Sequence, residues 1–187
     1  MARWGLALLW AAFAAAFLAS HLRVRRARRL RRLSDRPVLR ARVSELGLLL
    51  EAVAVALVLG FRREAAHPAL AVPGLLLGAA AVALAWSAVF HLDRQWRLRA
   101  VIAENHALIT TGPYAVVRHP IYASLFGMLA ASALVNTPWP AAAGALALFL
   151  AGTEIRVRAE EKLLAKAFPE EFERYRKRVP AYLPSLR

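Results

Sequence analysis

Apolar runs that alternate with strongly basic segments constrain the fold of this 187-residue chain more than any other feature. Five such runs occur, at residues 4–20, 46–61, 69–92, 121–135 and 139–153. The first contains 17 uncharged residues, just enough for a helix to cross about 30 Å of hydrocarbon. Ten arginines follow this run, whereas a signal peptide has its cations before the apolar core. We therefore expect one integral membrane domain with about five transmembrane helices.

The predicted fold is an all-α, polytopic membrane helix bundle. No run shows the strict alternation of apolar and polar residues that is typical of a half-buried strand. The connection Asn136-Thr137-Pro138 is so short that the last two membrane helices should form an antiparallel hairpin. Apolar residues continue with helical spacing from Glu154 to Tyr175, which predicts a C-terminal cytosolic amphipathic helix, or two.

The distribution of cations predicts the orientation of the bundle. Three segments hold ten, four and nine Lys or Arg residues, namely 21–42, 93–120 and 154–187. The opposite side of the membrane would hold only Arg3, Arg62 and Arg63. Because cytoplasmic loops carry the excess of Lys and Arg, the N-terminus should lie outside the cell (inner) membrane. The C-terminus and the chemistry near it should then be cytosolic.

The charge and the composition also exclude several classes of function. The net charge of +14 would suggest nucleic acid in a soluble protein, but here the cations are confined between apolar runs, so we expect no nucleic-acid partner. The chain has no cysteine, which excludes a thiolate nucleophile and thiolate metal ligands. Its five histidines are scattered, and we predict no metal site.

Polar residues of the basic segments indicate a possible anion-binding site at the cytosolic face. Pro120 favours the first turn of a helix, so the fourth membrane helix should begin there and present its positive end to the cytosol. Arg118 and His119 precede that start and could hold a carboxylate or phosphate. An ordinary interfacial pair that caps a membrane helix would look the same in the sequence.

Two further charged groups are candidates. Arg156 and Glu160 lie four residues apart and share a helix face, either as a solvated pair or as one wall of a pocket. On the same helix Arg158 points away, so only one of the two arginines should face the site. Glu51 interrupts an apolar run, where a charge is costly unless it is paired. Pairing with an interfacial arginine is its simplest interpretation, and its role stays open.

Two stretches resemble a known family in combination. They are HALITTGPYAVVRHPIY at residues 106–122 and RVRAEEKLLAKAFPEEFERYRKRVPAYLP at residues 156–184. Together they resemble the C-terminal half of isoprenylcysteine carboxyl methyltransferases and the related phospholipid methyltransferases. The resemblance covers about residues 104–184, and the three earlier apolar runs match only in being apolar.

The resemblance implies a membrane methyltransferase that uses S-adenosylmethionine, held in a non-Rossmann pocket by the last helices. The cofactor-binding residues that it implies are His106, Tyr114, Arg118, His119, Tyr122, Glu160 and Glu161. It further implies that Arg156 and Glu161 act catalytically, with Arg156 at the reacting end. Relatives often have glycine where this chain has Ser124, which bears on close packing there.

The acceptor implied by the resemblance is a lipophilic or amphiphilic molecule, of the prenylcysteine carboxylate or phospholipid amine type, that enters from among the membrane lipids. Two other functions stay open at this point. One is an NADPH-dependent membrane reductase, because sterol reductases are distantly similar in their last helices. The other is a non-enzymatic lipid-binding membrane protein, which would not need the cluster of polar residues.

Overall fold

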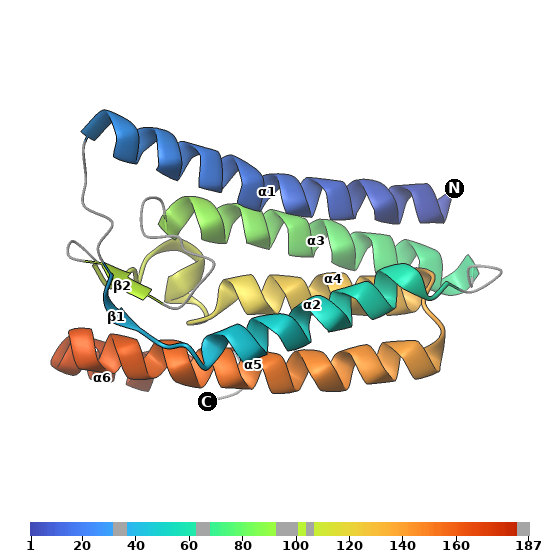
Figure 1. Ribbon diagram of the computed structural model, residues 1–187. Helices are drawn as coiled ribbons and strands as arrows, with labels where there is room; N and C mark the ends of the chain where they lie inside the picture. Colours follow the sequence, from blue (N-terminus) through green and yellow to red (C-terminus); the bar gives the residue numbers. More distant parts are fainter. Residues whose placement is uncertain (32–36, 63–67, 93–100, 104–106, 183–187) are drawn as a thin grey trace.

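The computed structural model describes residues 1–31, 37–62, 68–92, 101–103 and 107–182, and it shows a bundle of long helices. The long helices are α1 (Ala2–Arg31), α2 (Ser44–Gly60), α3 (Pro68–Leu92), α4 (Pro120–Val135) and α5 (Trp139–Ala167). They lie side by side, and each runs opposite to the one before it (Figure 1). A short helix, α6 (Pro169–Arg178), and a 3-10 turn, η2 (Gly112–Ala115), gather at one end of the bundle. The helical fold agrees with the prediction.

A two-stranded ribbon was not predicted. Strand β1 (Pro37–Arg40) pairs antiparallel with β2 (Val101–Ala103) and joins the two basic segments that follow α1 and α3. The ribbon lies at the same end of the bundle as α6 (Figure 1). Strands of three or four residues are too short for an alternating pattern to stand out in the sequence, and their pairing depends on residues about 60 positions apart.

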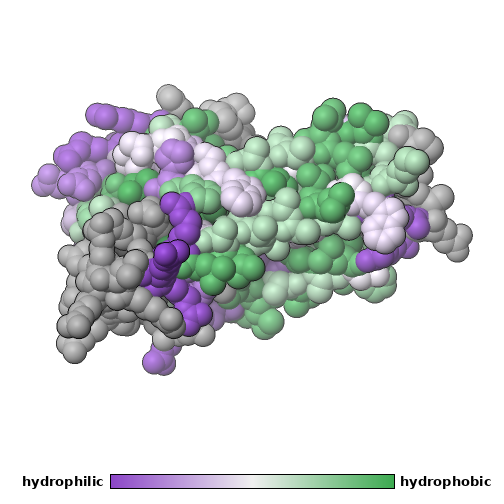
Figure 2. Space-filling view, turned by 90° about the horizontal axis from the view of Figure 1, so that it is seen from above, coloured by the Kyte–Doolittle hydropathy of each residue, from purple (hydrophilic) through white to green (hydrophobic). Residues whose placement is uncertain are grey.

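Three helical segments of the described residues are long and apolar enough to cross a membrane, namely Ala2–Arg26, Ala69–Leu92 and Trp139–Ala167. Helix α4 is apolar but shorter, and α2 has 17 residues. Figure 2 shows hydrophobic residues over much of the length of the bundle, whereas hydrophilic residues gather mainly at the end that holds α6 and the ribbon. The structure thus supports a membrane protein whose polar groups collect at one end.

Small residues let the helices approach one another closely. Helix α3 packs mainly against α4, and α2 against α5. At the α2–α5 crossing, a Cβ atom added to Gly47 would lie 2.5 Å from the carbonyl oxygen of Gly152, so neither helix could carry a larger residue there without moving. Small residues at helix–helix contacts are typical of membrane bundles, where close packing replaces the hydrophobic effect.

The hairpin of α4 and α5 brings the sequence motifs together. Helix α4 begins at Pro120 as predicted, because His119 leaves helical geometry (φ −124°, ψ 59°) immediately before it. The turn over residues 136–138 then reverses the chain, also as predicted, and α5 continues without a break to Ala167. The second half of α5 therefore returns to the polar end, beside the start of α4 (Figure 1).

Candidate active site

Two consecutive glutamates of α5 meet the start of α4. Glu161 Oε1 accepts a hydrogen bond from Arg118 Nε at 2.9 Å and lies 3.0 Å from His119 Nε2. Glu160 accepts from the hydroxyl of Tyr122, which lies one turn further along α4. Successive helical residues point about 100° apart, and this is why the two carboxylates contact different partners. The structure therefore brings five of the predicted site residues into one cluster.

Arg118 also holds the C-terminal segment. Its side chain donates to the carbonyls of Arg176 and Val179, and its backbone N–H donates to the carbonyl of Pro180 at 2.8 Å. The neighbouring N–H of His119 donates to the carbonyl of Ala181 at 3.0 Å. The anion that Arg118 binds in this structure is thus the side chain of Glu161, and the same arginine fixes the chain that follows α6.

Arg156 is the centre of a second part of the cluster, deeper in the bundle. Its side chain is 7% exposed, and Nε donates to the hydroxyl of Tyr122 at 2.7 Å. An Nη atom lies 3.7 Å from Glu160, and the guanidinium carbon lies 5.4 Å from the centre of the Tyr122 ring. Arg158 is 73% exposed and pairs with Glu154 on the outer face of α5. Of the two arginines Arg156 faces the cluster; helical spacing predicted that only one of them would, and the family resemblance selected Arg156.

Glu51 of α2 completes this part, and sequence reasoning did not assign it to the site. Its carboxylate is buried, with one oxygen 3.4 Å from Arg156 Nε and the other accepting from the Thr153 hydroxyl at 3.0 Å. The available signal was a single charge within an apolar run. That signal predicted a partner, but it could not say that the partner would be Arg156, which is 105 residues away.

Carboxyl side chains outnumber guanidinium groups in the described cluster. Three carboxylates meet two guanidinium groups, namely Glu51, Glu160 and Glu161 with Arg118 and Arg156. Glu160 and Glu161 have side chains 26% and 20% exposed, so a ligand can approach both from outside. The partly exposed carboxylates of Glu160 and Glu161 can accept hydrogen bonds from a cationic ligand.

Tyr114 adds a buried hydroxyl from the 3-10 turn. Gly112 begins this turn with φ +60°, and the ring of His91 lies where its Cβ would be, so both backbone conformation and space require glycine. The backbone carbonyl of Tyr114 accepts from the Tyr175 hydroxyl at 2.6 Å. The hydroxyl of Tyr114 is buried, and no hydrogen-bond partner for it is found among the described residues. Such a group is costly to bury unless a ligand satisfies it.

Burial keeps these two tyrosines protonated. It raises the pKa of Tyr114 well above its usual value and the pKa of Tyr175 to about 12. Both hydroxyls are therefore neutral donors at physiological pH.

His106, the remaining predicted cofactor residue, lies outside the described residues. Ser124, where relatives often have glycine, is buried and donates to the carbonyl of Ile121 at 2.7 Å. The described part of the chain contains no group of three or more His, Cys, Asp or Glu residues that could hold a metal ion.

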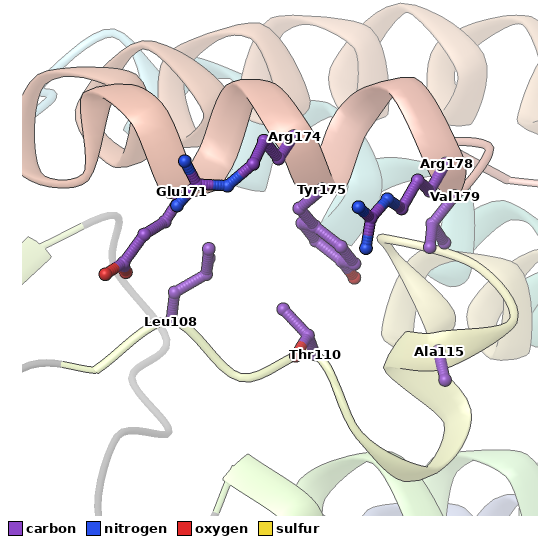
Figure 3. Close-up of a pocket in the computed structure, with 8 residues that line it drawn as sticks. All are labelled: Leu108, Thr110, Ala115, Glu171, Arg174, Tyr175, Arg178 and Val179. Carbon is purple, nitrogen blue, oxygen red and sulfur yellow. The ribbon is translucent and has the colours of Figure 1, made fainter.

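A groove lies between α6 and the segment before η2 (Figure 3). Its volume is about 580 Å³, and its walls are α6 and the segment that leads into η2. The lining residues are Leu108, Thr110, Ala115, Glu171, Arg174, Tyr175, Arg178 and Val179. Two of its lining residues contact site residues directly: Tyr175 donates to the carbonyl of Tyr114, and the carbonyl of Val179 accepts from Arg118.

Comparisons with known proteins found similarity to two groups of curated proteins. The cobalt-zinc-cadmium resistance protein CzcN of Cupriavidus metallidurans is 36% identical over 118 residues, 60% of this chain and 50% of that protein. The nickel-cobalt-cadmium resistance protein NccN of Alcaligenes xylosoxydans is 41% identical over 80 residues, 42% of this chain and 37% of that protein. The protein-S-isoprenylcysteine O-methyltransferase of Schizosaccharomyces pombe is 33% identical over 84 residues, 44% of this chain and 35% of that enzyme.

The chain spans about half, or less, of the length of these relatives. The family model for isoprenylcysteine carboxyl methyltransferases matches residues 74–166, about half of the chain. That stretch contains Tyr114, both residues before Pro120, Tyr122, Arg156 and the consecutive glutamates 160 and 161, whereas Glu51 precedes it. By this match, supported by the yeast relative, the chain belongs to the isoprenylcysteine carboxyl methyltransferase family.

Proposed function

We propose that the chain transfers a methyl group from S-adenosylmethionine to a lipophilic or amphiphilic acceptor at the cytosolic face of the membrane. The observation that carries this proposal is the cluster itself. Residues of the family motifs from two segments converge on Glu160, Glu161 and Arg156, at the polar end of an apolar bundle. A purely structural or lipid-binding bundle has no need for so many buried ionic groups, because each is costly to bury.

The residues fit a cationic methyl donor. S-adenosylmethionine carries a sulfonium that makes its methyl group electrophilic, together with an ammonium, a carboxylate, ribose hydroxyls and adenine. The partly exposed carboxylates of Glu160 and Glu161 can accept from the ammonium or the ribose, and the ring of Tyr122 can attract the sulfonium. The Tyr114 hydroxyl, which has no partner among the described side chains, can bind a polar group of the donor. His119 and Arg118 hold Glu161 in place.

Arg156 is the candidate for the reacting end. It is buried between Glu51 of α2 and the partly exposed Glu160, where a lipophilic acceptor and a water-borne donor could meet. Methyl transfer is an in-line displacement, so the main task of the protein is to hold donor and acceptor in line. A guanidinium fixed at this point can orient an anionic or polar acceptor.

The membrane arrangement is part of the proposal. With helices α1 to α5 all crossing the bilayer, the N-terminus lies outside and the cluster faces the cytosol, where S-adenosylmethionine is available. The 23-to-3 distribution of Lys and Arg supports this orientation. Helices α2 and α4 span about 24–26 Å at 1.5 Å per residue, which a locally thinned or tilted arrangement accommodates.

Cofactor binding to the detergent-solubilised protein tests the proposal. S-adenosylhomocysteine at a hundred times its dissociation constant should stabilise the native state by about 2.7 kcal/mol, while NADPH should not. Labelled S-adenosylmethionine is then offered with N-acetyl-S-farnesylcysteine, whose amine is blocked, or with phosphatidylethanolamine vesicles, and the lipid phase is counted. Label in the first indicates a carboxylate acceptor, and label in the second an amine. Stabilisation by NADPH alone would favour a reductase, and no effect of any nucleotide would favour a non-enzymatic protein.

A further inference from the structure

Glu51 is a buried charge that the motifs of the family match do not include. It lies in α2, which is otherwise apolar between Leu46 and Gly60, and its side chain is 6% exposed. A carboxylate at such a position is retained only where it is paired, and intramembrane ionisable groups commonly mark function. Its partners therefore define what it does.

The two oxygens of Glu51 have different partners. Oε1 accepts from the Thr153 hydroxyl at 3.0 Å, and Oε2 lies 3.4 Å from Arg156 Nε. Thr153 and Arg156 are three residues apart on α5, so both contacts are made to one face of the same helix. The threonine fixes the plane of the carboxylate, and the second oxygen is thereby aimed at the guanidinium.

Glycine brings α2 close enough for this contact. A Cβ atom on Gly47 would lie 2.6 Å from Cγ of Arg156, so the stem of the arginine passes over the bare backbone one turn before Glu51. The arginine is thus confined by α2 along its stem and by Glu51 at Nε, while Tyr122 and Glu160 meet it from the other side. An arginine held on both sides has one orientation instead of many rotamers.

We propose that Glu51 is a positioning residue that fixes the guanidinium of Arg156 for methyl transfer. This inference rests on the proposed function and adds to it a residue from α2, outside the motif-bearing half of the chain. Glu51 itself contacts neither the donor nor the acceptor. Its loss should lower turnover through misplacement of Arg156, without loss of cofactor affinity.

Three variants in the full-length protein test the role. Glu51→Gln keeps the shape and removes the charge, Glu51→Asp keeps the charge, and Thr153→Val keeps the carboxylate but releases its orientation. We expect kcat to fall at least about tenfold in Glu51→Gln, with partial recovery in Glu51→Asp and a smaller loss in Thr153→Val. The dissociation constant for S-adenosylhomocysteine should stay within about twofold of wild type. Arg158→Ala, on the outer face, serves as the matched control.

The outcomes separate this role from the proposed function. No methyl transfer to either lipid probe and no nucleotide binding by the wild type would refute the proposed function and this role with it. An active wild type with normal kcat in Glu51→Gln would refute only the role. An equal loss of kcat and cofactor affinity would instead make Glu51 part of the cofactor site. Where Glu51→Gln does not fold, Thr153→Val decides, and wild-type kcat in that variant would overturn the inference.

Discussion

Arg156 and Arg158 offer the sharpest test of the site, because they lie two residues apart on the same helix and differ in almost every contact. Arg156 is 6% exposed and meets Tyr122, Glu51 and Glu160. Arg158 is 73% exposed and meets only Glu154 among the partners that the described residues show. Replacing each with alanine removes the same side chain from the same helix, so the comparison isolates position.

The structure predicts different losses of folding stability for the two substitutions. Arg156→Ala leaves Glu51 buried with the Thr153 hydroxyl as its one remaining partner among the described residues. Removal of one partner of a buried ion pair costs about 3–5 kcal/mol. The exposed Arg158 pair contributes at most about 0.5 kcal/mol. The midpoint of thermal unfolding shifts by about 2–4 °C per kcal/mol in a chain of this size. Arg156→Ala should therefore unfold clearly earlier, and Arg158→Ala should resemble wild type.

A compensated variant separates stability from turnover. The double change Arg156→Gln with Glu51→Gln removes both charges, so no unpaired ion stays buried and much of the stability should return. Turnover should nevertheless stay about 10²- to 10³-fold below wild type, the effect of losing one aligned donor at a reacting centre. The assay is initial-rate methyl transfer on purified protein, together with the dissociation constant for S-adenosylhomocysteine. If Arg158→Ala were inactive while Arg156→Ala kept wild-type turnover, the conclusion that Arg156 faces the reacting groups would be refuted.

The start of α4 and the pairing of α4 with α5 were predictable because they depend on local residues, whereas the extension of α1 to Arg31, beyond the apolar run 4–20, was not predicted. Pro120 starts α4, and the turn before Trp139 is too short for any arrangement except a hairpin. The inward face of Arg156 followed from helical spacing once Glu160 was taken as a reference. Such predictions need only neighbours within one or two turns.

The contacts that the sequence could not supply join distant segments. Glu51 and Arg156 lie on helices that are not consecutive in the chain. No local sequence pattern indicates which arginine forms an ion pair with which carboxylate. The contact between His91 and Gly112 and the β1–β2 ribbon have the same character. Arg118 was expected to bind the anionic group of a ligand. Its pairing with Glu161 depends on how α5 is placed along α4. Nearby residues determine where a helix such as α4 starts, whereas the packing of the whole bundle determines which residues of two helices lie opposite each other.

The remaining predictions concern topology and cofactor contacts. Reporter fusions after residue 63 and after residue 187 should report outside and cytosol, and both on one side would refute the five-span arrangement. Arg118→Ala removes a charge-assisted contact of about 1.5–3 kcal/mol to Glu161, which should weaken S-adenosylhomocysteine binding about ten- to a hundredfold by calorimetry. Glu161→Gln should behave similarly, and unchanged affinity in both would confine them to structural roles. Tyr114→Phe should keep or raise the unfolding temperature, because within the described chain its hydroxyl has no partner and costs desolvation. The same change should weaken cofactor binding by about two- to tenfold if that hydroxyl serves the cofactor. Lower stability with unchanged affinity would show that the hydroxyl bonds to the protein instead.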